Sequence, residues 1–99
     1  MTTIFTRDES ADTNGTSLQL YLETATVAAM RAVFGAPDKD AYIDEEAGYT
    51  GDEWHFASND GRVFNVYARW GSELRVGAHG NCTDFAAWLL AETARTVAA

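Results

Sequence analysis

Residues 53–78 read EWHFASNDGRVFNVYARWGSELRVGA, and this stretch decides the fold. Apolar and polar side chains alternate on both sides of the Asp60-Gly61 pair, a pattern typical of two strands joined by a tight turn. A second turn signal at residues 71–72 leads into a third alternating run over residues 73–78. The stretch therefore predicts a three-stranded antiparallel meander.

The hydrophobic period changes once upstream of the meander. Residues 17–23 alternate as expected for a half-buried strand, with Leu18, Leu20 and Leu22 on the side predicted to face the helices. From Thr24 the apolar residues follow a helical period, which Gly35 ends as a C-cap and Pro37 prevents from continuing. The apolar stripe of this predicted helix consists of Val27, Met30, Val33 and Phe34.

A second helix is predicted downstream of the meander. Asn81 can cap its first turn, and Asp84 stands at the third helical position, where an acidic side chain completes a capping box. Its apolar stripe consists of Phe85, Trp88, Leu89 and Val97. Residues 38–53, in contrast, are rich in Asp and Glu without a sustained period, so we expect a loop there, with residues 41–44 as a candidate short edge strand.

Strands grouped apart from helices indicate an α+β fold. We predict an antiparallel sheet of about four strands in the order β-α-β-β-β-α, with two helices on one face. The polar, turn-rich start of the chain predicts a flexible N-terminal arm over residues 1–15, followed by a single α+β domain over residues 16–99.

Composition and charge exclude several classes of function. The chain has 99 residues, of which 46% are hydrophobic, so one packed core is expected. Its net charge of -8 repels a phosphate backbone, and we expect no nucleic-acid binding. Apolar runs are far shorter than the roughly 20 residues of a membrane span. A single Cys and the lack of a secretion signal favour the cytosol.

The face of the sheet turned away from the helices is the first candidate site. Period-two alternation places on it Tyr21, His55, Asn65, Tyr67, Arg69 and Arg75. One interpretation is a solvated face with polar cross-strand pairs. The other is a binding surface, because Tyr and Arg are enriched in interface cores and Arg beside His and Tyr suits an anionic ligand. A second candidate contact is the acidic loop, with Asp44, Glu45 and Glu46.

No catalytic motif is present, so we expect neither an enzyme nor a cofactor or resident metal. His55 and His79 lack the spacing of zinc ligands. The glycine-rich stretch 77–81 leads into a helix N-terminus, where free N–H groups can hold an anion. It lacks the Lys and the Ser or Thr of a P-loop. The alternative interpretation is a tight strand-to-helix turn that needs glycine for its backbone angles. Cys82 at that terminus is either a nucleophile or a small core residue.

Several short segments share a pattern and read Thr16-Ser17-Leu18-Gln19, Phe34-Gly35-Ala36-Pro37, Glu53-Trp54, Asp60-Gly61 and Arg75-Val76-Gly77-Ala78-His79. Together they resemble a widespread family of small bacteriophage proteins with no established activity. That family has a T-S-L-Q strand, an F-G-x-P helix end, an E-W strand and a G-G-H-like turn. Leu20 and Ala78 depart from the pattern, where glycine is expected. The resemblance implies a viral accessory protein made in the host bacterial cytosol.

Two functional hypotheses follow. The first is a non-enzymatic phage accessory protein that engages or inhibits a host protein through the polar-aromatic face or the acidic loop. The alternative is a binder or sponge for a nucleotide-like signal, in which Arg69 and Arg75 hold phosphates while tyrosines stack on the base. We also expect a homodimer, formed through the sheet face or an edge strand, because a small core leaves part of the aromatic surface uncovered.

Overall fold

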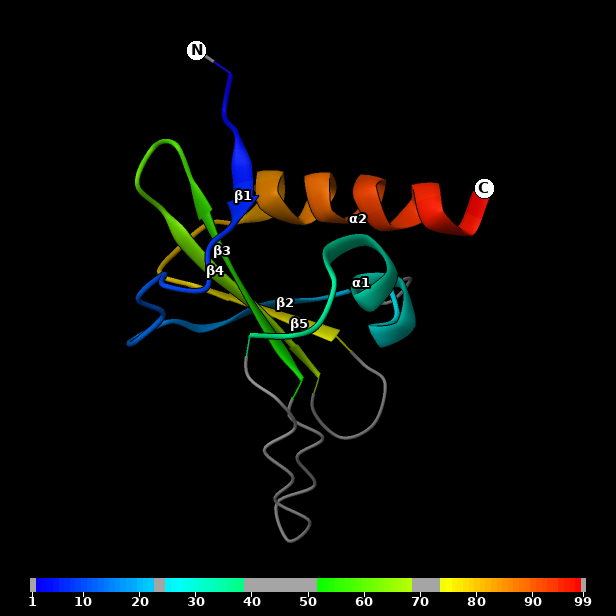
Figure 1. Cartoon of the computed structure of the whole chain (residues 1–99). Coiled ribbons are helices and arrows are strands. Elements are labelled where there is room, and N and C mark those ends of the chain that lie inside the picture. Colours follow the sequence, from blue (N-terminus) through cyan, green and yellow to red (C-terminus); the bar gives the residue numbers. More distant parts are fainter. Residues whose placement is uncertain (1, 23–24, 39–51, 69–73, 99) are drawn as a thin grey trace, which may run out of the picture.

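A computed structural model describes residues 2–22, 25–38, 52–68 and 74–98 of the chain (Figure 1). They form an α+β fold with a five-stranded antiparallel sheet in the order β1-β3-β4-β5-β2. The elements are β1 (Phe5–Arg7), β2 (Ser17–Leu22), α1 (Val27–Phe34), β3 (Glu53–Ser58), β4 (Val63–Ala68), β5 (Leu74–Ala78) and α2 (Thr83–Ala98). The candidate edge strand at residues 41–44 lies outside the described residues.

The predicted meander is confirmed by strands β3, β4 and β5. Trp54 lies opposite Val66, and Val66 lies opposite Val76, so the core-facing side chains are in register across the three strands. Gly61, in the turn between β3 and β4, has a φ of 89°, a left-handed conformation that favours glycine. The Asp60-Gly61 turn therefore fixes the register from which the sheet is built.

Strand β1 corrects the sequence prediction, which places residues 5–7 in a flexible arm. Phe5 lies opposite Ser58 of β3. Its ring packs edge-on against Phe64 and Phe85, with centroids 5.7 and 5.5 Å away. A three-residue strand is too short to show an alternating period, so the sequence pattern does not reveal it. The sheet therefore has one strand beyond the four that were expected.

Both helices pack on one face of the sheet (Figure 1). Phe85 of α2 stacks on Phe64 of β4 with ring centroids 4.2 Å apart, and Phe34 of α1 meets Phe56 of β3 edge-on at 5.1 Å. The largest side chains of this core are Met30, Trp54, Phe56, Phe64, Val66, Leu74, Val76, Phe85 and Leu89. Among the strand residues predicted to face the helices, Leu18 is the clear exception, since it is 40% exposed.

Helix α1 begins at Val27, later than the start at Thr24 that its period predicts, and Thr26 is its cap: the Thr26 hydroxyl accepts a hydrogen bond from the Ala29 N–H at 3.1 Å. Helix α2 begins at Thr83, and the Cys82 carbonyl accepts its first intrahelical bond, so Asn81 lies one residue before the predicted cap position; its Oδ1 still accepts from the Thr83 N–H at 3.0 Å. Asp84, expected to complete a capping box, instead directs its carboxylate to Arg62. Neither described helix has the length and apolar character needed to cross a membrane.

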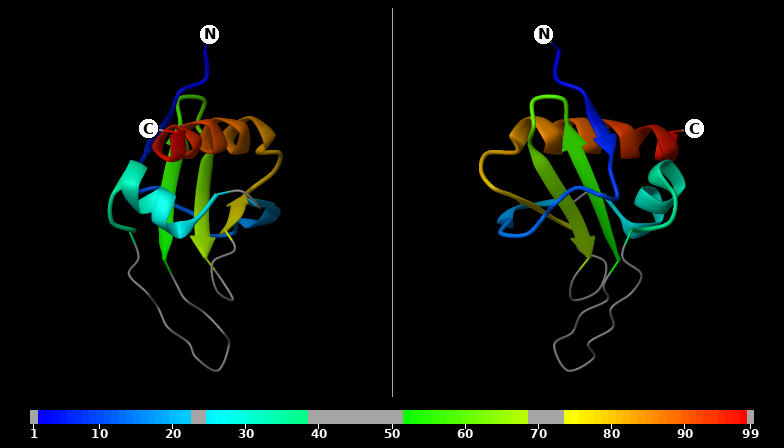
Figure 2. Two further views of the ribbon diagram at one scale, coloured as in Figure 1. Left: turned by 90° about the vertical axis from the view of Figure 1, so that its right-hand side faces the viewer. Right: turned by 60° about the vertical axis from the view of Figure 1, so that its left-hand side comes forward.

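The connection between β1 and β2 runs across the sheet, because these strands form opposite edges (Figure 2). We call residues 8–16 the crossing segment. At its start the Asp8 N–H donates to the His55 carbonyl at 3.0 Å, and at its end the Thr16 hydroxyl donates to Asn65 at 3.2 Å. The crossing segment therefore lies over the face opposite the helices.

Candidate functional site

A β-bulge at Gln19 changes which side chains of β2 share a face. Leu18 lies opposite Gly77 and Tyr21 lies opposite Arg75, so three steps along β2 match two steps along β5. The Gln19 side-chain amide donates to a carbonyl of β5 at 3.2 Å and holds the bulge in place. Leu18 and Tyr21 therefore point to the same side, away from the helices, which explains why Leu18 does not join the core.

The described members of the predicted site lie on this face in two rows. The first, which we call the aromatic row, consists of Tyr21, Arg75, Tyr67 and Glu53. The second, which we call the buried row, consists of Gly77, Asn65 and His55, and the exposed Leu18 lies opposite Gly77 at the sheet edge. The remaining predicted site residues, Arg69 and the acidic-loop residues Asp44, Glu45 and Glu46, lie outside the described residues.

The aromatic row is the accessible part of the face. The Arg75 guanidinium lies over the Tyr21 ring, 5.1 Å from its centroid, in a cation–π contact. Tyr21 is 47% exposed, and Tyr67 and Arg75 are half-buried. These side chains combine flat apolar surface with hydrogen-bonding groups, which is the chemistry of protein interfaces.

In the buried row, His55 and Asn65 are covered by the crossing segment and held by contacts within the protein. His55 is 6% exposed and Asn65 is 9% exposed. The His55 Nε2 lies 2.5 Å from a Glu53 carboxylate oxygen, and the His55 backbone N–H donates to Asp38 at 2.8 Å. These two predicted site residues therefore stabilise the fold locally and do not offer an open surface to a ligand.

Asn65 occupies the space directly above Gly77. A Cβ atom at Gly77 would lie 2.2 Å from the Asn65 Oδ1, far inside van der Waals contact. Glycine is thus required at this position for close approach of a neighbouring side chain. Gly77 belongs to the glycine-rich stretch 77–81, for which an anion-binding turn was one interpretation. In the structure, the lack of a side chain at Gly77 leaves room for Asn65.

The crossing segment adds negative charge to the same face. It contains Asp8, Glu9 and Asp12 and no Lys or Arg, and Glu9 and Asp12 are exposed. The Ser10 hydroxyl and N–H donate to the Asp8 carboxylate at 2.6 and 3.0 Å and lower its pKa. The face opposite the helices therefore joins carboxylates with partly exposed tyrosines.

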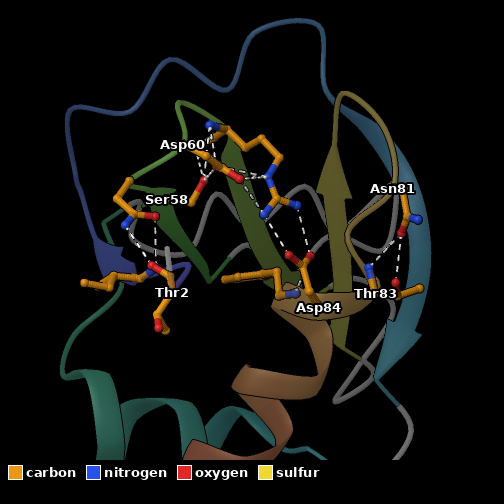
Figure 3. Close-up of polar contacts among 10 residues, drawn as sticks. Thr2, Ser58, Asp60, Asn81, Thr83 and Asp84 are labelled. Carbon is orange, nitrogen blue, oxygen red and sulfur yellow. Dashed lines mark hydrogen bonds and ion pairs between the residues drawn. The ribbon is translucent and has the colours of Figure 1, made fainter.

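A second polar cluster lies where the β3–β4 turn meets the start of α2 (Figure 3). Arg62 donates to both carboxylate oxygens of Asp84, at 3.0 and 2.7 Å, and its Nε donates to Asp60 at 3.1 and 3.0 Å. The Ser58 hydroxyl also donates to Asp60. The bonds from Arg62 and Ser58 lower the pKa of Asp60 to about 2, and Arg62 also lowers the pKa of Asp84.

A pocket of about 330 Å³ adjoins this cluster and is lined by residues 61–64 and 78–81. The guanidinium of Arg62, which lines the pocket, already forms ion pairs with the carboxylates of Asp60 and Asp84. Cys82 at the helix start is 1% exposed, and burial raises the pKa of its thiol. The pocket therefore gives no support to an anion site or a cysteine nucleophile.

Replacing Arg62 with methionine is expected to raise the pKa of Asp60 toward the ordinary value of about 3.9. Because folding lowers this pKa, the Asp60 contacts stabilise the fold above about pH 3.9 and lose that effect as the pH falls through about 2. NMR titration of the Asp60 carboxyl carbon measures the change. Arg95→Met, which removes an ion pair with Glu92, is the control and should leave the Asp60 titration unaltered. An unshifted midpoint in R62M contradicts the assignment.

Comparison of the chain with protein-family models, curated proteins and solved structures finds no match. The bacteriophage resemblance stays a prediction.

Proposed function

We propose that this protein is a non-enzymatic binding protein that engages a basic partner protein through the face opposite its helices. One observation supports the proposal above others: the exposed carboxylates of the crossing segment and the tyrosines of the aromatic row share that face. Tyrosines serve the centre of an interface. The carboxylates, together with the net charge of -8 of the whole chain, attract a basic partner and speed its association.

The resemblance to small bacteriophage proteins supplies a setting for this proposal. In that setting the protein acts in the bacterial cytosol and its partner is a host protein. A basic surface that normally contacts nucleic acid, such as the groove of a nuclease or repressor, has the charge this face complements. Occupying that groove would inhibit the host protein.

The alternative, a sponge for a nucleotide-like signal, draws less support from the side-chain contacts. Among the described arginines, Arg7 forms an ion pair with Asp38, Arg31 with Asp52, Arg62 with Asp60 and Asp84, and Arg95 with Glu92. Arg75 lies over the Tyr21 ring. Phosphate groups need positive charge that the protein's own carboxylates have not already neutralised.

A charge-reversal pair tests the proposal. Glu9→Lys changes the crossing segment, and Glu92→Lys makes the same change in charge on α2. Each variant and the parent chain are immobilised and exposed to host lysate, and association rates are measured for any retained protein. We expect the parent and E92K to retain the same protein, and E9K to bind it more slowly with a weaker dependence on salt. Retention of no protein, or equal binding by E9K and E92K, overturns the proposal.

A further inference from the structure

Strand β2 forms one edge of the sheet and pairs only with β5 among the described strands. Its sequence, SLQLYL, contains neither a charged residue nor a proline, which are common means of preventing an edge strand from pairing. Leu18 and Tyr21 on this strand are 40% and 47% exposed. Within the described part of the chain, the edge therefore offers unpaired backbone beside exposed apolar side chains.

The bulge does not remove this pairing capacity. Gln19 folds its side-chain amide back onto Ser17 and β5, so the irregularity is satisfied within the protein. Beyond it, Leu20, Tyr21 and Leu22 stay in regular register with β5. The bulge also brings Leu18 and Tyr21 onto one side, where together they form an apolar patch along the edge.

The opposite edge of the sheet differs in each of these respects. Strand β1 is only three residues long. Its Arg7 side chain forms an ion pair with Asp38 at 2.5 Å and also donates to the Phe34 carbonyl. A short edge carrying a charge is protected against pairing. Of the two edges, β2 is the one suited to accept another strand.

We propose that β2 pairs in antiparallel orientation with β2 of a second copy of this chain, about a two-fold axis perpendicular to the sheet. Charge decides the occupant. A basic partner needs acidic groups on the strand, whereas the sequence of β2, SLQLYL, has none. A second copy brings the same neutral strand, so two chains of net charge -8 meet through strands that carry no charged side chain.

The two-fold axis makes the apolar patch self-complementary. It keeps equivalent faces of both sheets on the same side, so Leu18 and Tyr21 of one copy lie beside those of the other. Cross-strand contacts between aromatic and aliphatic side chains stabilise antiparallel pairing. The joined sheet also presents two aromatic rows on one side. This inference goes beyond the proposed function and stands whether or not a foreign partner binds.

Sedimentation equilibrium of the full chain over a concentration series, at about 0.15 M salt, tests the dimer. We expect the parent chain to reach the mass of a dimer. Leu18→Lys is expected to weaken association about tenfold or more, or about 1.4 kcal/mol, because the ammonium would be desolvated in the patch. Ile4→Lys is the matched control, since Ile4 is 56% exposed beside the opposite edge, and it should dimerise like the parent chain.

Hydrogen exchange identifies the surface. Amides of Ser17–Leu22 should exchange more slowly at high concentration than at low concentration, while those of Phe5–Arg7 should not change. Tyr21→Lys is the second variant, used if thermal unfolding shows that L18K is not folded. A monomeric mass throughout the series, equal weakening by L18K and I4K, or a dimer without added protection of β2 overturns the proposal.

Discussion

Replacing Phe85 with alanine is expected to destabilise the fold by about 3–5 kcal/mol, because it opens a cavity at the centre of the core. Phe85 is fully buried, and its ring contacts those of Phe5, Phe56 and Phe64. The residue thus joins α2 to strands β1, β3 and β4. Domains of this size have a free energy of unfolding of about 5–15 kcal/mol, so the loss is a large share of the total. Chemical denaturation followed by tryptophan fluorescence measures it.

Phe85→Leu is the matched control for the cavity. Leucine keeps much of the buried apolar volume, and we expect it to cost roughly 1.5 kcal/mol or less. Equal losses for F85A and F85L, or a loss below about 1.5 kcal/mol for F85A, would show that the packing around this ring is looser than described.

Replacing Gly77 with alanine is expected to cost about 1–3 kcal/mol, although the added group is a single methyl. The new Cβ would lie 2.2 Å from the Asn65 Oδ1. Asn65 cannot move freely, because it is 9% exposed and bonded by the Thr16 hydroxyl. Accommodating the methyl therefore displaces Asn65 and loosens the crossing segment above it. The midpoint of chemical denaturation reports the change.

Gly80→Ala is the matched control, since a Cβ at Gly80 meets no atom within 4 Å. We expect this variant to differ from the parent by no more than about 0.5 kcal/mol. The double variant Asn65→Ala/Gly77→Ala should lose less stability than the sum of the single variants, because the first substitution removes the clash. A cost for G77A no larger than that for G80A contradicts the arrangement of the buried row.

The meander and the core were predictable because their signals are local. The Asp60-Gly61 turn lies inside the segment that it folds, and the alternation around it assigns Trp54, Phe64 and Val76 to the core. Strand β1 was not predictable, because three residues carry no period and the partner of Phe5 is Ser58, far along the chain. Pairing between distant segments leaves little trace in either one alone.

The candidate site was likewise predictable where the signal lies within one strand and not where it depends on contact between distant segments. Alternation correctly placed Tyr21, Tyr67 and Arg75 on one face, since that follows from period two within each strand. It misassigned Leu18 to the core, because the bulge depends on contact with β5. The burial of His55 was equally hidden, since it follows from the route of the crossing segment and thus from strand order.

The placement of β1 and β2 at the two edges has a consequence for how the chain is made. Both strands leave the ribosome before their partners exist, because β1 pairs with β3 and β2 pairs with β5. Strand β1 can pair only after β3 has been made, and β2 only after β5 has been made, so both early strands close onto segments that are synthesised later. Nascent β1 and β2 are therefore without their sheet partners until then, and that interval is when a chaperone or protease has access to them.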